Sequence, residues 1–158
     1  MSVCHNNFNP HNVIISEKTR NNVMEGSDFH RLIFSDEHCS TNGIYIHFGL
    51  KNITVEKYFN KIKCCFDNNS INNQTISSIK SIEKMILNKF KNIQNRTLSC
   101  RIQEQLQNGF IKLYGDDNVK YGKQNEIHFL LKISGIWASN QVNDFGLTFR
   151  FFIFNNQF

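Results

Sequence analysis

Basic and aromatic side chains recur through the C-terminal half of the chain, where together they could hold an unpaired nucleic-acid strand. Bases stack on flat aromatic rings for about 1–3 kcal/mol each, while lysine and arginine neutralise the phosphates. The candidate binding residues are Lys112, Tyr114, Lys120, Tyr121, Lys123, Lys132, Trp137 and Arg150. The chain has 18 basic and 13 acidic residues and a net charge of +5, which suits an anionic partner but is shared by proteins that bind none.

Several of these candidates belong to a predicted hairpin over 126–154. Alternation places one set of side chains on the core face of the two arms, namely Ile127, Phe129, Leu131, Ile133, Trp137, Leu147, Phe149, Phe151 and Ile153. The opposite face of the return arm mixes Thr148 and Arg150 with Phe152 and Phe154. Such a face could stack bases, or its phenylalanines could pack beneath helices with Arg150 at the sheet margin. Spacing alone favours packing for these residues and for Trp137. Gly135 marks a bulge or bend.

The elements that must position these residues follow from periodicity and turn signals. Strands are predicted over 12–16, 28–36, 42–50, 97–106 and 109–115, before a loop over 116–125 and the closing hairpin. Apolar residues at helical spacing predict one helix within 53–67, with Thr54 as N-cap, and a second over 74–90. This order favours an α+β domain of mainly antiparallel strands. A small barrel of the oligonucleotide-binding type, with two helices inserted between strands, fits it.

Composition predicts a single intracellular domain over 11–154, between a mobile tail at 1–10 and a short tail at 155–158. The polar N-terminus carries no secretory signal, and no apolar run is long enough to cross a membrane. Five cysteines without a C-x-x-C spacing are expected to be reduced thiols, and we predict neither a metal nor a cofactor.

Catalytic motifs are absent from the sequence. It contains no G-x-x-x-x-G-K-[ST], no G-x-S-x-G and no H-E-x-x-H. The pair Asp116–Asp117 could bind a cation, but turn chemistry explains it. We therefore predict a binding protein that is not an enzyme.

Three segments resemble a known group of proteins. They are "IYIHFGLKNITVEKYFNKI" (44–62), "FIKLYG" (110–115) and "GIWASNQVNDFGLTFRF" (135–151). In this order they look like the small single-stranded-DNA-binding proteins of large DNA viruses and virus-like mobile elements. Those proteins are similar to phage replication proteins with an oligonucleotide-binding fold. The similarity spans roughly residues 42–154.

The resemblance implies a replication or recombination accessory that coats exposed single strands without sequence preference, in the nucleus or at a viral replication site. It points to Lys112, Trp137 and Arg150 as residues of interest. The implied partners are single-stranded DNA and replication proteins, with RNA and a homo-oligomer left open. The acidic C-terminal tail of the phage proteins is missing, although the terminal Phe158 is present. The alternative is a viral protein–protein interaction module that binds no nucleic acid.

Overall fold

The computed structural model describes residues 2–67, 70–91, 95–114 and 119–154. The first half of the chain contains β1 (Val3–Cys4), the 3-10 turns η1 (His5–Asn7) and η2 (Pro10–Asn12), β2 (Val13–Arg20), β3 (Ser27–Ser35), β4 (Ser40–Asn42), β5 (Ile44–Tyr58) and β6 (Lys61–Phe66). The second half contains α1 (Ser70–Lys91), β7 (Thr97–Ser99), α2 (Arg101–Gln107), β8 (Phe110–Tyr114), β9 (Gly122–Ser139) and β10 (Asp144–Ile153).

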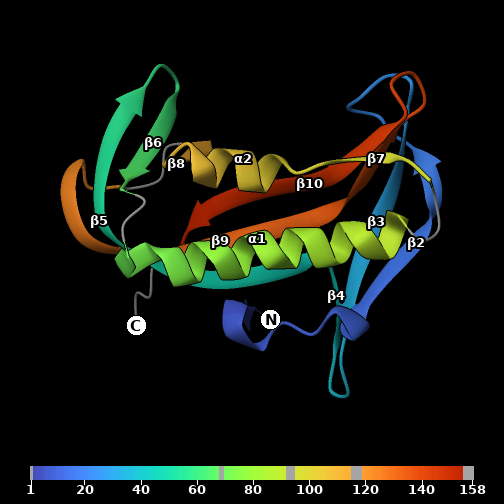
Figure 1. The fold of residues 1–158 in the computed structure, drawn as a ribbon, viewed down its shortest axis with the longest axis horizontal. Coiled ribbons are helices and arrows are strands. Elements are labelled where there is room, and N and C mark those ends of the chain that lie inside the picture. Colours follow the sequence, from blue (N-terminus) through green and yellow to red (C-terminus); the bar gives the residue numbers. More distant parts are fainter. Residues whose placement is uncertain (1, 68–69, 92–94, 115–118, 155–158) are drawn as a thin grey trace.

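One mostly antiparallel sheet organises the chain, so the predicted α+β class is confirmed. Its hydrogen-bonded path runs β2-β3-β9-β5-β6-β8, and β10 pairs with β9. The short β1–β5 and β7–β10 pairs are parallel. The sheet is open, since no ladder among the described strands joins β8 to β10 or to β2. In Figure 1 the β5–β6 hairpin projects at upper left, the β9–β10 connection lies at upper right, and α1 crosses in front of the sheet.

Helix α1 matches the predicted second helix and begins a few residues earlier. Its predicted apolar stripe is buried throughout: Ile76, Ile79, Ile82, Ile86 and Phe90. At its start the buried Asn72 side chain accepts from the Lys51 amide and donates to the Lys51 carbonyl, both at 2.9 Å. These two hydrogen bonds satisfy the backbone N–H and C=O groups of Lys51 in β5, next to Asn52, which has a φ of 55°.

The helix predicted within 53–67 is wrong, because this segment forms the β5–β6 hairpin. Ile53 pairs with Phe66 and Val55 with Cys64, and all four side chains are buried. The same apolar residues fit a strand period of two as well as a helical one. The tip residues Tyr58 and Phe59, which would have faced the core of a helix, are 44% and 82% exposed.

The strand predicted over 97–106 is also wrong beyond its first residues, since α2 begins at Arg101. Ile102 and Leu106 are spaced four apart and both are fully buried. The start of α2 is capped by Glu83 of α1, whose carboxylate oxygens accept from the amides of Ile102 and Gln103 at 2.9 Å each. Burial raises the pKa of Glu83, and these two hydrogen bonds act in the opposite direction.

A bulge in β9 moves Trp137 off the core face. Gly135 pairs with Thr148 but Ile133 pairs with Phe149, so Ser134 is an extra residue. The predicted bulge at Gly135 is therefore confirmed, and the predicted core position of Trp137 is corrected. Trp137 is 3% exposed, yet it lies outside the main cluster of core residues and pairs with Gly146 on the outer face.

Residues 2–10, predicted as a mobile tail, pack against the domain. Val3 pairs with Ile46 in β5, and the Ser78 hydroxyl of α1 donates to the His5 carbonyl. The predicted tail over 155–158 lies outside the described residues. Neither helix in the described ranges combines the length and apolar character needed to cross a membrane.

Candidate nucleic-acid interface

Cations and aromatic rings gather on the outer face of the β5–β6–β8 sheet. Opposite residues in an antiparallel ladder share a face, and here Lys61 is opposite Tyr114 while Lys63 is opposite Lys112. Tyr58 at the end of β5 pairs with Lys61. We call this surface, together with its continuation on β10, the basic aromatic strip: Tyr58, Lys61, Lys63, Phe110, Lys112, Tyr114, Arg150 and Phe152.

Each cation of the strip lies over a ring within the range of cation–π attraction. Lys61 Nζ is 4.5 Å from the centre of the Tyr114 ring. Lys63 Nζ and Lys112 Nζ lie 4.8 and 5.2 Å from the Phe110 ring centre. Such contacts hold ammonium groups near the surface at about 0.5–1 kcal/mol each where water has access. The rings and charges of the strip are therefore interleaved.

Arg150 joins β10 to the strip. Its Nη2 donates to the Tyr114 carbonyl at 2.9 Å, and its guanidinium carbon lies 5.1 Å from the Phe152 ring centre. Arg150 also pairs with Lys132 of β9, whose Nζ is 5.7 Å from the Tyr45 ring centre. The mixed face predicted for the closing hairpin is thus continuous with β8.

No cation of the strip forms an ion pair with a carboxylate among the described residues. Across the described ranges the one ion pair joins His128 to Glu126, with 3.5 Å between Nε2 and Oε1. Glu56 is opposite Lys63 and offsets part of its charge, and the Glu56 carboxylate also accepts from the Cys65 thiol at 3.4 Å. Burial, followed by this hydrogen bond, raises the pKa of Cys65. Like charges on facing residues destabilise a sheet, so the Lys63–Lys112 pair is costly unless an anion offsets it.

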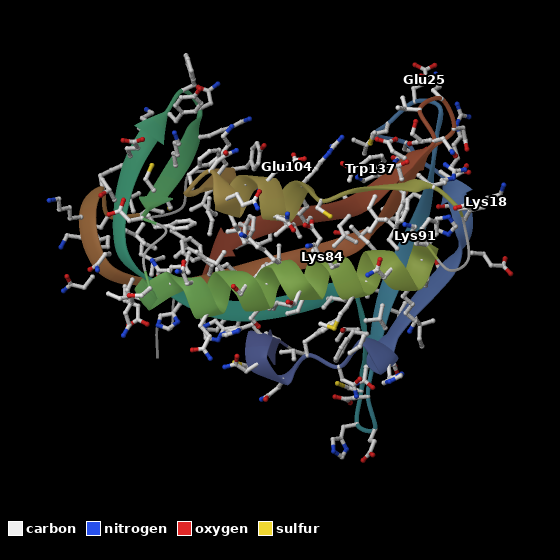
Figure 2. The ribbon with its side chains drawn as sticks, viewed as in Figure 1. Lys18, Glu25, Lys84, Lys91, Glu104 and Trp137 are labelled. Carbon is white, nitrogen blue, oxygen red and sulfur yellow. The ribbon has the colours of Figure 1, made fainter. Side chains whose placement is uncertain are left out.

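A pocket of about 790 Å³ adjoins the strip at Tyr114. Three arginines line it, Arg20 from the end of β2, Arg31 from β3 and Arg101 from α2, and its aromatic walls are Phe29, Trp137 and Phe149. We call it the arginine pocket. No Asp or Glu is among its lining residues within the described part of the chain. Figure 2 shows Trp137 between α2 and the β2–β3 side of the molecule.

The structure brings together some of the predicted binding residues and separates others. Lys112, Tyr114 and Arg150 lie in the basic aromatic strip, Lys132 is the cross-strand neighbour of Arg150, and Trp137 lines the adjoining pocket. The second group, Lys120, Tyr121 and Lys123, lies at or before the start of β9. Lys123 is opposite Thr54, so β5 and β6 separate it from β8.

Four residues of the strip were not among the predicted binding residues: Tyr58, Lys61, Lys63 and Phe110. The predicted helix within 53–67 would have spread Lys61 and Lys63 around a helix surface instead of aligning them on one sheet face. A strand period of two over 61–66 was the available signal, since Lys61, Lys63 and Cys65 alternate with buried Ile62, Cys64 and Phe66.

The described residues contain no group of three or more His, Cys, Asp or Glu side chains arranged to hold a metal ion. Burial raises the pKa of the Cys64 thiol to about 12, which makes it a packing residue at neutral pH. Asp116, Asp117 and Phe158 lie outside the described residues.

Comparison with protein families, curated proteins and solved structures found no match to this chain.

Proposed function

We propose that this protein binds single-stranded nucleic acid, with single-stranded DNA as its ligand, along the basic aromatic strip. The observation that supports the proposal best is the interleaving of Lys61, Lys63 and Lys112 with exposed or half-buried rings on one sheet face. Rings and cations in alternation match the bases and phosphates of an unpaired strand. A duplex hides its bases and offers only phosphates to such a surface.

The open sheet suits this role in the manner of an oligonucleotide-binding fold. We propose that β5, β6, β8, β9 and β10 form the equivalent of such a barrel, with β8 held beside β10 by Arg150 rather than by a ladder. The β5–β6 hairpin then forms one side of the interface. Its tip offers Phe59, 4.9 Å from Tyr58 between ring centres and 82% exposed, to the bound strand.

The resemblance to viral single-stranded-DNA-binding proteins supports the same function. On this proposal the protein is a non-catalytic replication or recombination accessory that acts where single strands are exposed, in the nucleus or at a viral replication site. Its binding depends on charge and stacking, so it is insensitive to base sequence.

Fluorescence anisotropy with a labelled dT oligonucleotide, a matching RNA and a matching duplex tests the proposal. We expect the single strand to bind more tightly than the duplex and its affinity to fall with salt. Equal affinity for single strand and duplex, or no binding at low salt, contradicts the proposal, and the second result favours the protein–protein module.

Matched charge variants locate the site. Replacing Lys63 and Lys112 by Gln removes two strip cations, and we expect the slope of log K against log salt to become shallower by about 1.4, since each phosphate contact to a single strand contributes about 0.7. The control replaces Lys84 and Lys91 of α1, both exposed and labelled in Figure 2, by Gln. A third variant at Lys120 and Lys123 should have the smaller effect. An equal loss in all three variants indicates diffuse attraction without a defined site.

A further inference from the structure

The arginine pocket is the most unusual feature of the molecule outside the strip. Arg20 and Arg31 are exposed and, within the described part of the chain, form no ion pair or side-chain hydrogen bond. Its volume of about 790 Å³ lies within the range of small-molecule sites, about 300–1,000 Å³. Arg20 is opposite Asp28 in the β2–β3 ladder, but no carboxylate lines the pocket within the described residues. An anionic ligand would therefore offset the repulsion among the three arginines.

Trp137 has an environment that core packing does not explain. On one side, Arg101 lies over the indole, with 4.7 Å between its guanidinium carbon and the ring centre. On the other side is Gly146, where an added Cβ would lie 2.7 Å from Trp137 Cζ2. Gly146 thus leaves space for the ring, and Trp137 in turn supports the guanidinium of Arg101.

The indole nitrogen of Trp137 adds a second, independent indication. The residue is only 3% exposed, and its Nε1 has no hydrogen-bond partner among the described residues. A buried donor without a partner costs about 1–3 kcal/mol and is rare in native proteins. Because Nε1 is itself closed off from solvent, an acceptor on a molecule in the pocket would satisfy it only once neighbouring side chains shift.

We propose that the arginine pocket holds one nucleotide of the bound strand, with its phosphate at Arg20 and Arg31 and its base against the Arg101 guanidinium. Arginine planes stack on unpaired bases as aromatic rings do. The neighbouring nucleotides then continue over Tyr114, which belongs to both the pocket and the strip. This inference rests on the proposed single-strand binding and adds an anchoring site to it. The nucleotide held in the pocket is either the terminal nucleotide of the strand or one within it, and a circular oligonucleotide distinguishes the two.

Trp137 is the only tryptophan of the chain, so its fluorescence reports on this pocket alone. Wild-type protein is titrated with an unlabelled dT oligonucleotide and, separately, with thymidine 5′-monophosphate. We expect the oligonucleotide to change the Trp137 emission, and the monophosphate to produce the same change at higher concentration. A circular dT oligonucleotide identifies the source: an unchanged response indicates an internal nucleotide, and a lost response indicates a strand end.

Variants provide the control. Replacing Arg20 and Arg31 by Gln should abolish the response to the monophosphate and weaken oligonucleotide binding about tenfold or more. Because the two arginines share one phosphate, the slope of log K against log salt should become shallower by about 0.7. Lys18→Gln, on the same strand as Arg20 but outside the pocket, should leave both unchanged. Oligonucleotide binding with a silent Trp137, or with full affinity in the double variant, overturns the pocket proposal and leaves the strip intact. Absence of oligonucleotide binding in the wild type overturns both proposals.

Discussion

Glu83 connects the hydrophobic core to the interface, and its removal gives a sharp test of how the interface is positioned. The carboxylate is 1% exposed and accepts from two amides at the start of α2. Helix α2 in turn presents Arg101 to the pocket, and its Gln105 side chain accepts from the Lys112 amide at 2.8 Å. Loss of this cap should therefore reach both the pocket and the strip.

The expected cost of Glu83→Ala follows from the two amides. Each buried N–H left without an acceptor costs about 1–3 kcal/mol, and relief from burying a carboxylate offsets part of this. We expect the free energy of unfolding to fall by roughly 2–4 kcal/mol, a large share of the ~5–15 kcal/mol typical of a domain. Urea unfolding followed by circular dichroism measures it, and Trp137 emission reports whether α2 has moved.

The control is Glu104→Ala, which removes an exposed carboxylate of α2 and should change stability by no more than about 0.5 kcal/mol. If Glu83→Ala is as mild as this control, the Glu83 carboxylate does not hold the start of α2. Glu83→Gln adds a pH test. A carboxyl group with a raised folded-state pKa stabilises most below its ordinary pKa of about 4.5, and that contribution is lost as pH rises through the raised value. The Gln variant should lack this loss.

Three further predictions concern other parts of the molecule. Burial, followed by repulsion from His128, lowers the pKa of His47. The contribution of neutral His47 to the free energy of unfolding is therefore complete above pH ~6.5 and is lost as the pH drops through the lowered pKa. Thermal unfolding measured against pH should show a weaker fall in stability for His47→Gln. Gly135→Ala would place a Cβ 2.3 Å from Phe29 Cζ and should cost about 1–3 kcal/mol in urea unfolding. Gly122→Ala meets no atom within 4 Å, so any cost there measures only the strain of alanine at its φ of 93°. Phe59 has a φ of 53°, a conformation that asparagine adopts more readily, so Phe59→Asn should stabilise the β5–β6 hairpin by about 1 kcal/mol. The same change removes an exposed ring and should weaken binding of a dT oligonucleotide, measured by anisotropy. Unchanged affinity would mean that the hairpin tip does not touch the strand.

The sequence predicted those elements whose signals are local. The isoleucine stripe of α1 identified a helix because its spacing fits no strand. The core face of the closing hairpin was also predicted, since Phe129, Leu131 and Phe151 are buried as alternation requires. The α+β class follows from these two elements and from the order of the others.

The failures share a physical cause, which is that partners distant in sequence decide the local structure. The apolar residues of segment 53–67 are compatible with both helical and strand periodicity. The segment forms strands because β5 pairs with β9 and β6 pairs with β8. At α2 the cap comes from Glu83, so no capping residue marks the start of this short helix in the sequence around Cys100.

The same dependence explains why the sequence identified only some residues of the candidate interface. Lys112, Tyr114 and Arg150 were identified by residue type, but their neighbours Lys61 and Lys63 come from a hairpin that a helical interpretation had dispersed. Trp137 was assigned to the core because one inserted residue, Ser134, reverses every later side chain of β9. The bulge places the nearly buried indole of Trp137 beside Arg101, and the indole nitrogen has no hydrogen-bond partner among the described residues. Register rather than composition therefore turns this part of the sheet into a candidate ligand site.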